Sequence, residues 1–116
     1  MTVREGSISQ RYDRDTYLKV VADVTANIDS IPVTTQDPLS TVLKFVNRTL
    51  KHDPQANLSC NRAYASYENW SLLLGVEPIP HAVFCDNLNH FVDEVLADKV
   101  KHVKGADDDV YHGLSL

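Results

Sequence analysis

The chain has 116 residues, of which 43% are apolar, and this is enough for one small domain with its own core. Its formal net charge of −5 argues against binding nucleic acid through overall charge, because counterion release requires clustered Lys and Arg side chains. No apolar run approaches the roughly 18 residues that span a bilayer, so we expect a soluble cytoplasmic protein that does not enter a membrane.

Residues 1–12 mix Gly and Ser with charged residues and have no sustained period, which predicts a mobile arm. A solvated tail is the interpretation that we favour. The alternative is a basic arm that reaches DNA through Arg4, Arg11 and Arg14.

An amphipathic helix is predicted next, from a cap at Asp13 or Asp15 to about Ile28. Its large apolar side chains fall on one face: Tyr17, Leu18, Val21, Val24 and Ile28. This face must be covered either by the rest of the chain or by a second copy, and we expect a homodimer. Residues 29–36 are predicted to form an extended linker because a proline disfavours helix in the residue before it. Helix and linker together make an N-terminal region of residues 13–36.

The main domain is predicted at residues 37–116 and begins with Asp37 and Pro38, a helix cap followed by a first-turn proline. This helix is expected to reach about Lys51, and its inner stripe consists of Leu39, Val42, Leu43, Val46 and Leu50. Residues 52–57 are rich in turn-forming residues and are predicted to be a loop.

Two helices joined by a short turn are predicted from the following stretch. Ser59 caps the first helix, and Gly75 stops it. Its apolar positions recur at three- and four-residue spacings: Ala63, Tyr64, Tyr67, Trp70, Leu73 and Leu74. Pro80 is expected in the first turn of the second helix, whose buried stripe is Val83, Phe84, Leu88, Phe91 or Val92, Val95 and Leu96. Cys60 and Cys85 lie beside the two helix starts and are expected to be buried, unpaired residues.

Residues 99–104 and 109–116 are β-branched or alternating in pattern and flank a Gly-Ala-Asp-Asp turn, which predicts a terminal β-hairpin. Helix, turn, helix and hairpin in this order are typical of a winged helix-turn-helix. We therefore predict a mostly α (α+β) fold: a winged helix-turn-helix with a C-terminal β-hairpin and an extra N-terminal helix.

The same part of the chain resembles a known family. The residues that carry the resemblance are Ala63-Tyr64, Tyr67, Trp70, Gly75, Pro78, Phe84, Leu88 and the closing Val110-Tyr111-His112-Gly113-Leu114. Over residues 39–116 the chain resembles the C-terminal winged-helix domain of phage and plasmid primase-helicases, the viral superfamily 3 helicase group that includes poxvirus-type enzymes. The resemblance implies origin or template DNA as the ligand. The chain lacks that family's helicase motor, since it has no Gly-x-x-x-x-Gly-Lys-Ser/Thr phosphate loop.

The second helix of the pair supplies the predicted base readers, Asn87, Asn89 and His90. Asn side chains pair bidentately with adenine edges, and His donates to bases or phosphates. The carboxylates on the same helix oppose this interpretation: Asp86, Asp93 and Glu94. The alternative is therefore a solvated or protein-contact face.

The hairpin supplies the predicted phosphate contacts, Lys99, Lys101, His102 and Lys104, in an alternating basic strand. The alternative is a set of edge-strand lysines that only prevent aggregation, and Asp107, Asp108 and Asp109 at the wing tip would repel phosphate. A second basic group lies on the preceding helices: Lys44, Arg48, Lys51 and Arg62.

No metal, cofactor or catalytic site is predicted. The histidines and cysteines show no spacing that would put two ligands on one face, and the three consecutive aspartates lack the spaced ligands of a calcium loop. The aromatic positions Tyr64, Tyr67 and Trp70 are interpreted as core and not as a stacking platform for bases.

The expected function is that of a non-catalytic, DNA-binding winged-helix module of a phage, plasmid or other mobile element, acting on duplex DNA in replication or its control. The alternative is an acidic winged-helix module that binds protein and not nucleic acid, either as a homodimer or as an adaptor to a helicase or polymerase.

Overall fold

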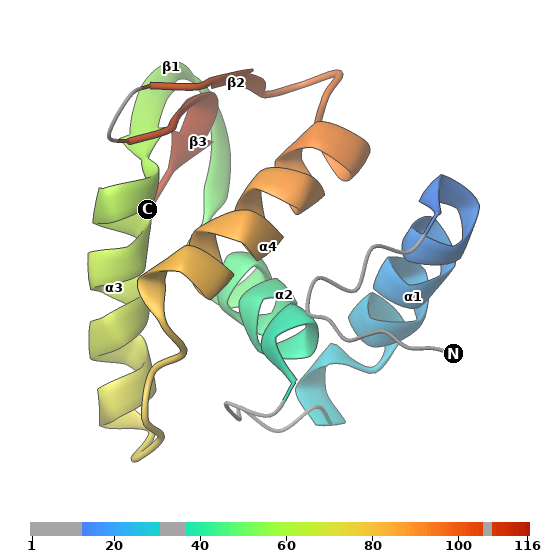
Figure 1. Ribbon diagram of the computed structural model, residues 1–116, viewed down its shortest axis with the longest axis vertical. Coiled ribbons are helices and arrows are strands. Elements are labelled where there is room, and N and C mark those ends of the chain that lie inside the picture. The colour runs from blue at the N-terminus through green and yellow to red at the C-terminus, as the bar shows by residue number, and fades with distance from the viewer. Residues whose placement is uncertain (1–12, 31–36, 106–107) are drawn as a thin grey trace.

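The computed structural model describes residues 13–30, 37–105 and 108–116 (Figure 1). The arm predicted at residues 1–12 and most of the predicted linker lie outside this range. In chain order the elements are α1 (Arg14–Ala26), a 3-10 helix (Ile28–Ser30), α2 (Pro38–Thr49), β1 (Lys51–Ser59), α3 (Cys60–Leu73), α4 (His81–Val95), β2 (Lys101–Val103) and β3 (Val110–Ser115). The described residues therefore form a mixed α+β fold.

Three of the helices start where the sequence predicts, each with a side-chain cap. Asp13, Asp37 and Ser59 accept a hydrogen bond from the amide three residues further on, at 2.8, 3.3 and 3.1 Å. These bonds satisfy amides that the first turn of a helix leaves unpaired. Pro80 is the capping residue of α4 and lies just before its first turn, one position earlier than expected.

The sheet has the strand order β1-β3-β2, and both pairings are antiparallel. The predicted terminal hairpin is thus present, with β3 as the central strand. Figure 1 shows the sheet at one end of the molecule, with α3 running away from it and α4 lying between α3 and α1.

The loop predicted at residues 52–57 is instead part of strand β1. The pairing of β1 with β3 shifts register between His52 and Asn57, so the turn-forming residues occupy an irregular part of the strand. Within it, the amide of Gln55 donates to Oδ1 of Asp53 at 3.0 Å. Turn chemistry is present there, but the flanking residues still pair with β3.

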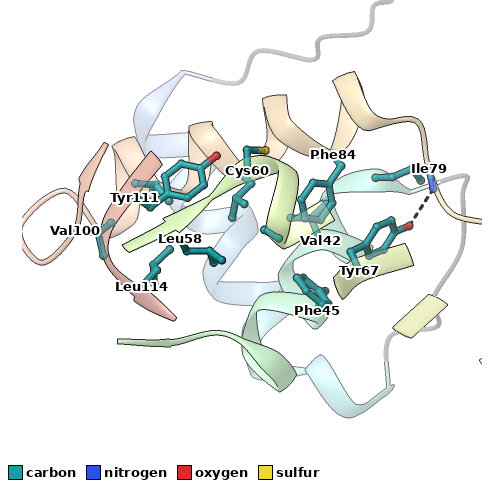
Figure 2. Packing of buried hydrophobic residues seen from close by; sticks show 13 residues of the cluster. Val42, Phe45, Leu58, Cys60, Tyr67, Ile79, Phe84, Val100, Tyr111 and Leu114 are labelled. Carbon is teal, nitrogen blue, oxygen red and sulfur yellow. Dashed lines mark hydrogen bonds between the residues drawn. The ribbon is translucent and has the colours of Figure 1, made fainter. Parts of the chain in front are cut away.

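The main core lies between α2, α3, α4 and the sheet (Figure 2). Of the side chains expected to meet there, Tyr67, Phe84, Leu88 and Tyr111 are fully buried, and Tyr64 and Trp70 are partly buried against them. Phe45 is the main omission from the prediction, because its ring contacts those of Tyr67, Trp70 and Phe84.

The C-terminal end of α3 departs from the prediction. Leu73 and Leu74 were expected on the buried stripe, but 87% and 53% of their surface is exposed. Leu72 is also exposed, at 62%. The stripe fails here because α3 ends at Leu73, beyond the part of the helix that α2 and α4 cover.

A second, smaller core joins α1 to the rest of the chain. Tyr17 and Val21 pack on Leu43 of α2, with Phe91 and Val95 of α4 beside them. The apolar face of α1 that motivated the homodimer is therefore covered by its own chain. A homodimer remains a proposal without that support.

Candidate functional site

The helix predicted to read bases, α4, is exposed on a face without positive charge. His81, Ala82, Asp86 and Asp93 are exposed, and α4 contains no Lys or Arg. The whole stretch of residues 63–98 also lacks Lys and Arg, and it holds six carboxylates: Glu68, Glu77, Asp86, Asp93, Glu94 and Asp98. We call residues 63–98 the acidic unit. It spans α3, the turn and α4, the parts that form the helix-turn-helix.

The three predicted base readers are engaged within the molecule. Asn89 donates from Nδ2 to Oδ2 of Asp109 at 3.0 Å and accepts from the hydroxyl of Tyr111 at its Oδ1. Asn87 donates from Nδ2 to the carbonyl of Val83 in its own helix at 2.9 Å. None of these amide groups is directed at solvent in an arrangement that would meet a base edge.

His90, the third predicted reader, faces α1. Its ring lies edge-on to that of Tyr17, with 4.1 Å between the ring centroids. Close by, Nε of Arg14 lies 3.3 Å from Oε1 of Glu94. Burial, followed by the negative charge of Glu94, raises the pKa of the Tyr17 phenol above its ordinary value. The side of α4 that carries His90 is thus occupied by α1.

His102 is held between two carboxylates and is not a surface contact. Its side chain is only 5% exposed, and Nδ1 lies 2.8 Å from Oδ1 of Asp93. Nε2 lies 3.2 Å from Oδ1 of Asp109, which is ion-pair distance but lacks hydrogen-bond alignment. His102 therefore links β2 to α4 and to the residue before β3.

The acidic residues before β3 also point inward. Oδ1 of Asp108 accepts from the amide of Asn61 at 3.1 Å, and the carbonyl of Asp109 accepts from the amide of Cys60 at 2.8 Å. Both acceptors lie at the N-terminus of α3, where unpaired amides and the helix dipole favour negative charge. Asp107 lies outside the described residues. The repulsion of phosphate expected from Asp108 and Asp109 is reduced, because their acceptors serve the fold.

The predicted phosphate contacts fall into two separate groups. Lys99, Lys101 and Lys104 are exposed, and no ion pair joins them to a carboxylate among residues 13–30, 37–105 and 108–116. Arg48, by contrast, is paired with Asp29. Lys51 is exposed and pairs in register with Ser115, at the end of the sheet away from β2. The basic residues therefore do not form one surface.

Cys60 and Cys85 form a disulfide, which corrects the expectation of two unpaired thiols. Their Cα atoms are 6.2 Å apart, within the usual range for such a bond. The bridge joins the first residue of α3 to α4, and Nε2 of His81 lies 3.5 Å from Sγ of Cys85. Two cysteines 25 residues apart carry no pairing signal in sequence, because proximity arises only when α4 packs on α3.

Two kinds of site are absent from the described residues. No helix among them is long and apolar enough to cross a membrane. In the same ranges, no three His, Cys, Asp or Glu side chains are grouped so that they could hold a metal ion.

Comparison with known proteins found no matching family model, no matching curated protein and no matching solved structure.

Proposed function

We propose that this protein is a winged-helix module without catalytic activity that binds a basic segment of another protein through its acidic unit. Support for the fold comes from the order α2-β1-α3-α4-β2-β3 and from the strand order β1-β3-β2, which are typical of winged helices. The single observation that carries the function is the acidic unit itself: residues 63–98 contain six carboxylates and no Lys or Arg. Complementary charge steers such a surface toward a basic partner.

The resemblance to primase-helicases suggests the setting. An adaptor to a helicase or polymerase, in the replication of a phage, plasmid or other mobile element, is the partner relationship that we propose. A homodimer is the other form that a protein-interaction module takes.

Duplex DNA is the second candidate ligand, and a specific observation favours it. Lys99, Lys101 and Lys104 are exposed on and beside β2, and Asp108 and Asp109 are turned toward α3 and α4. On this proposal the wing, meaning β2, β3 and the residues between them, contacts phosphates without reading bases. α4 opposes this proposal, because Asp86 and Asp93 would approach the phosphates with it.

Fluorescence anisotropy at two salt concentrations separates the two ligands. The probes are a labelled duplex, a labelled single strand and a labelled helical peptide of Lys and Leu, with a Glu-Leu peptide as the control. The protein-binding proposal expects the Lys-Leu peptide to bind and to weaken as salt rises, and neither DNA nor the Glu-Leu peptide to bind.

Salt-dependent binding of duplex DNA would overturn this choice. The triple variant Lys99→Ala/Lys101→Ala/Lys104→Ala then tests the wing. If each lysine contacts one phosphate, it flattens the slope of log K against log salt by about 0.9 per contact. Lys19→Ala, an exposed change on α1, is the matched control and should leave that slope unchanged.

A further inference from the structure

Three consecutive leucines are exposed where α3 meets the turn to α4. Leu72, Leu73 and Leu74 are 62%, 87% and 53% exposed, and we call them the leucine ridge. Single exposed leucines are common on soluble proteins, but contiguous apolar surface marks interaction sites. In Figure 1 the ridge end of α3 lies away from the sheet, at the far end of a helix about 20 Å long by its rise per residue.

The turn beneath the ridge is fixed by side chains of α3. The hydroxyl of Tyr64 donates to the carbonyl of Ile79 at 2.7 Å, and the amide of Ile79 donates to the hydroxyl of Tyr67 at 3.0 Å (Figure 2). Oγ of Ser71 donates to the carbonyl of Val76 at 2.7 Å. These bonds hold residues 76–79 against α3. A partner at the ridge therefore meets a surface that is already ordered, which lowers the entropy cost of binding.

Charge identifies the kind of partner. Glu68 lies one helical turn before Leu72, on the same side of α3, and Glu77 follows the ridge in the turn. The nearest basic residues in the chain are Arg62 and Lys99, outside the acidic unit. An apolar ridge flanked only by carboxylates is complementary to an amphipathic segment whose apolar side chains are bordered by Lys or Arg.

We propose that the leucine ridge is the docking site for a basic amphipathic helix of a partner protein, with Leu72 and Leu73 as apolar anchors and Glu68 and Glu77 as the charged rim. This inference rests on the proposed function and gives the acidic unit a defined contact point. It also leaves the wing uncovered, because α3 carries the ridge away from the sheet.

The chain contains a reporter for this site. Trp70 is the only tryptophan and lies one turn before Leu74 on α3, partly buried against Phe45. Binding at the ridge should therefore change its fluorescence. The probe is a helical peptide of Lys and Leu without tryptophan, and a Lys-Ser peptide of equal charge is the control for electrostatic attraction alone.

The test variant is Leu72→Ser/Leu73→Ser, and Leu116→Ser is the matched control, since Leu116 is exposed at the far end of β3. The Lys-Leu peptide should shift Trp70 emission in the wild-type protein and in the control. It should bind the double variant at least about tenfold more weakly, as expected when anchor residues are removed. The thermal midpoints of all three proteins should agree, because the changed side chains are exposed.

The remaining outcomes separate the ridge from the proposed function. If the double variant binds the Lys-Leu peptide as tightly as the wild type does, the ridge proposal is overturned, and the acidic unit keeps its basic ligand. If no basic peptide binds the wild-type protein at all, the proposed function and the ridge fail together. If the wild-type protein sediments as a dimer and the double variant as a monomer, a second copy occupies the ridge and the proposal of a basic partner is overturned.

Discussion

The hydroxyl of Tyr111 donates a hydrogen bond to Oδ1 of Asn89 and so joins the central strand β3 to α4 inside the molecule. The amide nitrogen of the same Asn89 donates to Asp109 at 3.0 Å. Both halves of this side-chain amide are therefore used by the fold. A residue that the sequence offers as a base reader acts here as a structural link between the wing and α4.

Tyr111→Phe should destabilise the protein, by about 1–3 kcal/mol, because it leaves the Asn89 oxygen partly buried without its donor. Tyr17→Phe is the matched control. The Tyr17 hydroxyl is buried, and no hydrogen-bond partner for it exists among the described residues, so removing it should be neutral or stabilising. Urea unfolding of both variants measures the difference, and equal losses would show that the two hydroxyls are not distinguished in this way.

Stability should fall at alkaline pH. Burial is the main cause that raises the pKa of Tyr17 and of Tyr111 above the ordinary 10.0, and nearby carboxylates, Glu94 and Asp109 foremost, add to it. Above pH 10.0 the unfolded chain loses phenol protons that the folded protein keeps, so the free energy of unfolding decreases as pH rises toward the folded pKa values. Below 10.0 this contribution is fully present.

Urea midpoints on either side of pH 10.0 check this loss. The double variant Tyr17→Phe/Tyr111→Phe should lose less stability over the same range, since both phenols are gone. Ordinary titration of every tyrosine in the folded protein, followed by absorbance, would contradict the expectation.

Reduction of the Cys60–Cys85 disulfide should destabilise the protein. The bridge closes a separation of 25 residues, for which the chain-entropy relation gives about 3–4 kcal/mol. The thermal midpoint should therefore drop when a dithiol reductant is added. Cys60→Ala/Cys85→Ala is the control and should not respond to reductant, whereas two titratable thiols in the native wild-type protein would exclude the bridge.

Gly113→Ala should destabilise the sheet. Gly113 has a φ of +114°, which side chains rarely adopt, and an added Cβ would lie 2.9 Å from the carbonyl oxygen of Lys99. Strain of this kind costs roughly 1–3 kcal/mol. Gly75→Ala is a useful comparison, because Gly75 also has a positive φ but its added Cβ would meet nothing within 4 Å. A smaller loss is expected at Gly75, and an equal loss would assign the whole effect to the backbone conformation.

Much of the fold was predictable because its signals are local. Asp13, Asp37 and Ser59 act as caps, and the apolar spacing of Tyr67 on α3 and of Phe84 and Leu88 on α4 marks buried positions. The failures come where the outcome depends on distant residues. Strand β1 forms because β3 pairs with it despite turn-forming residues in its middle, and the end of α3 is exposed because no other element reaches it.

The candidate site was harder to predict for the same reason. Helical spacing places Asn89 and His90 near one another, but only the packing of α1 and β3 on α4 decides that both side chains face inward. The pattern of charge was more informative. The lack of Lys and Arg on α4 is a property of the sequence, and the fold keeps Asp86 and Asp93 exposed.

The measurement that tests the protein-binding proposal most directly is a backbone amide NMR titration of the isotope-labelled protein, first with the Lys-Leu peptide and then with duplex DNA at low salt. We predict that the peptide shifts amides at the end of α3, in the turn and on the exposed face of α4, and that DNA shifts none. Shifts produced by DNA in β2 and β3, around Lys99, Lys101 and Lys104, with no response of α3 or α4 to the peptide, would contradict the account.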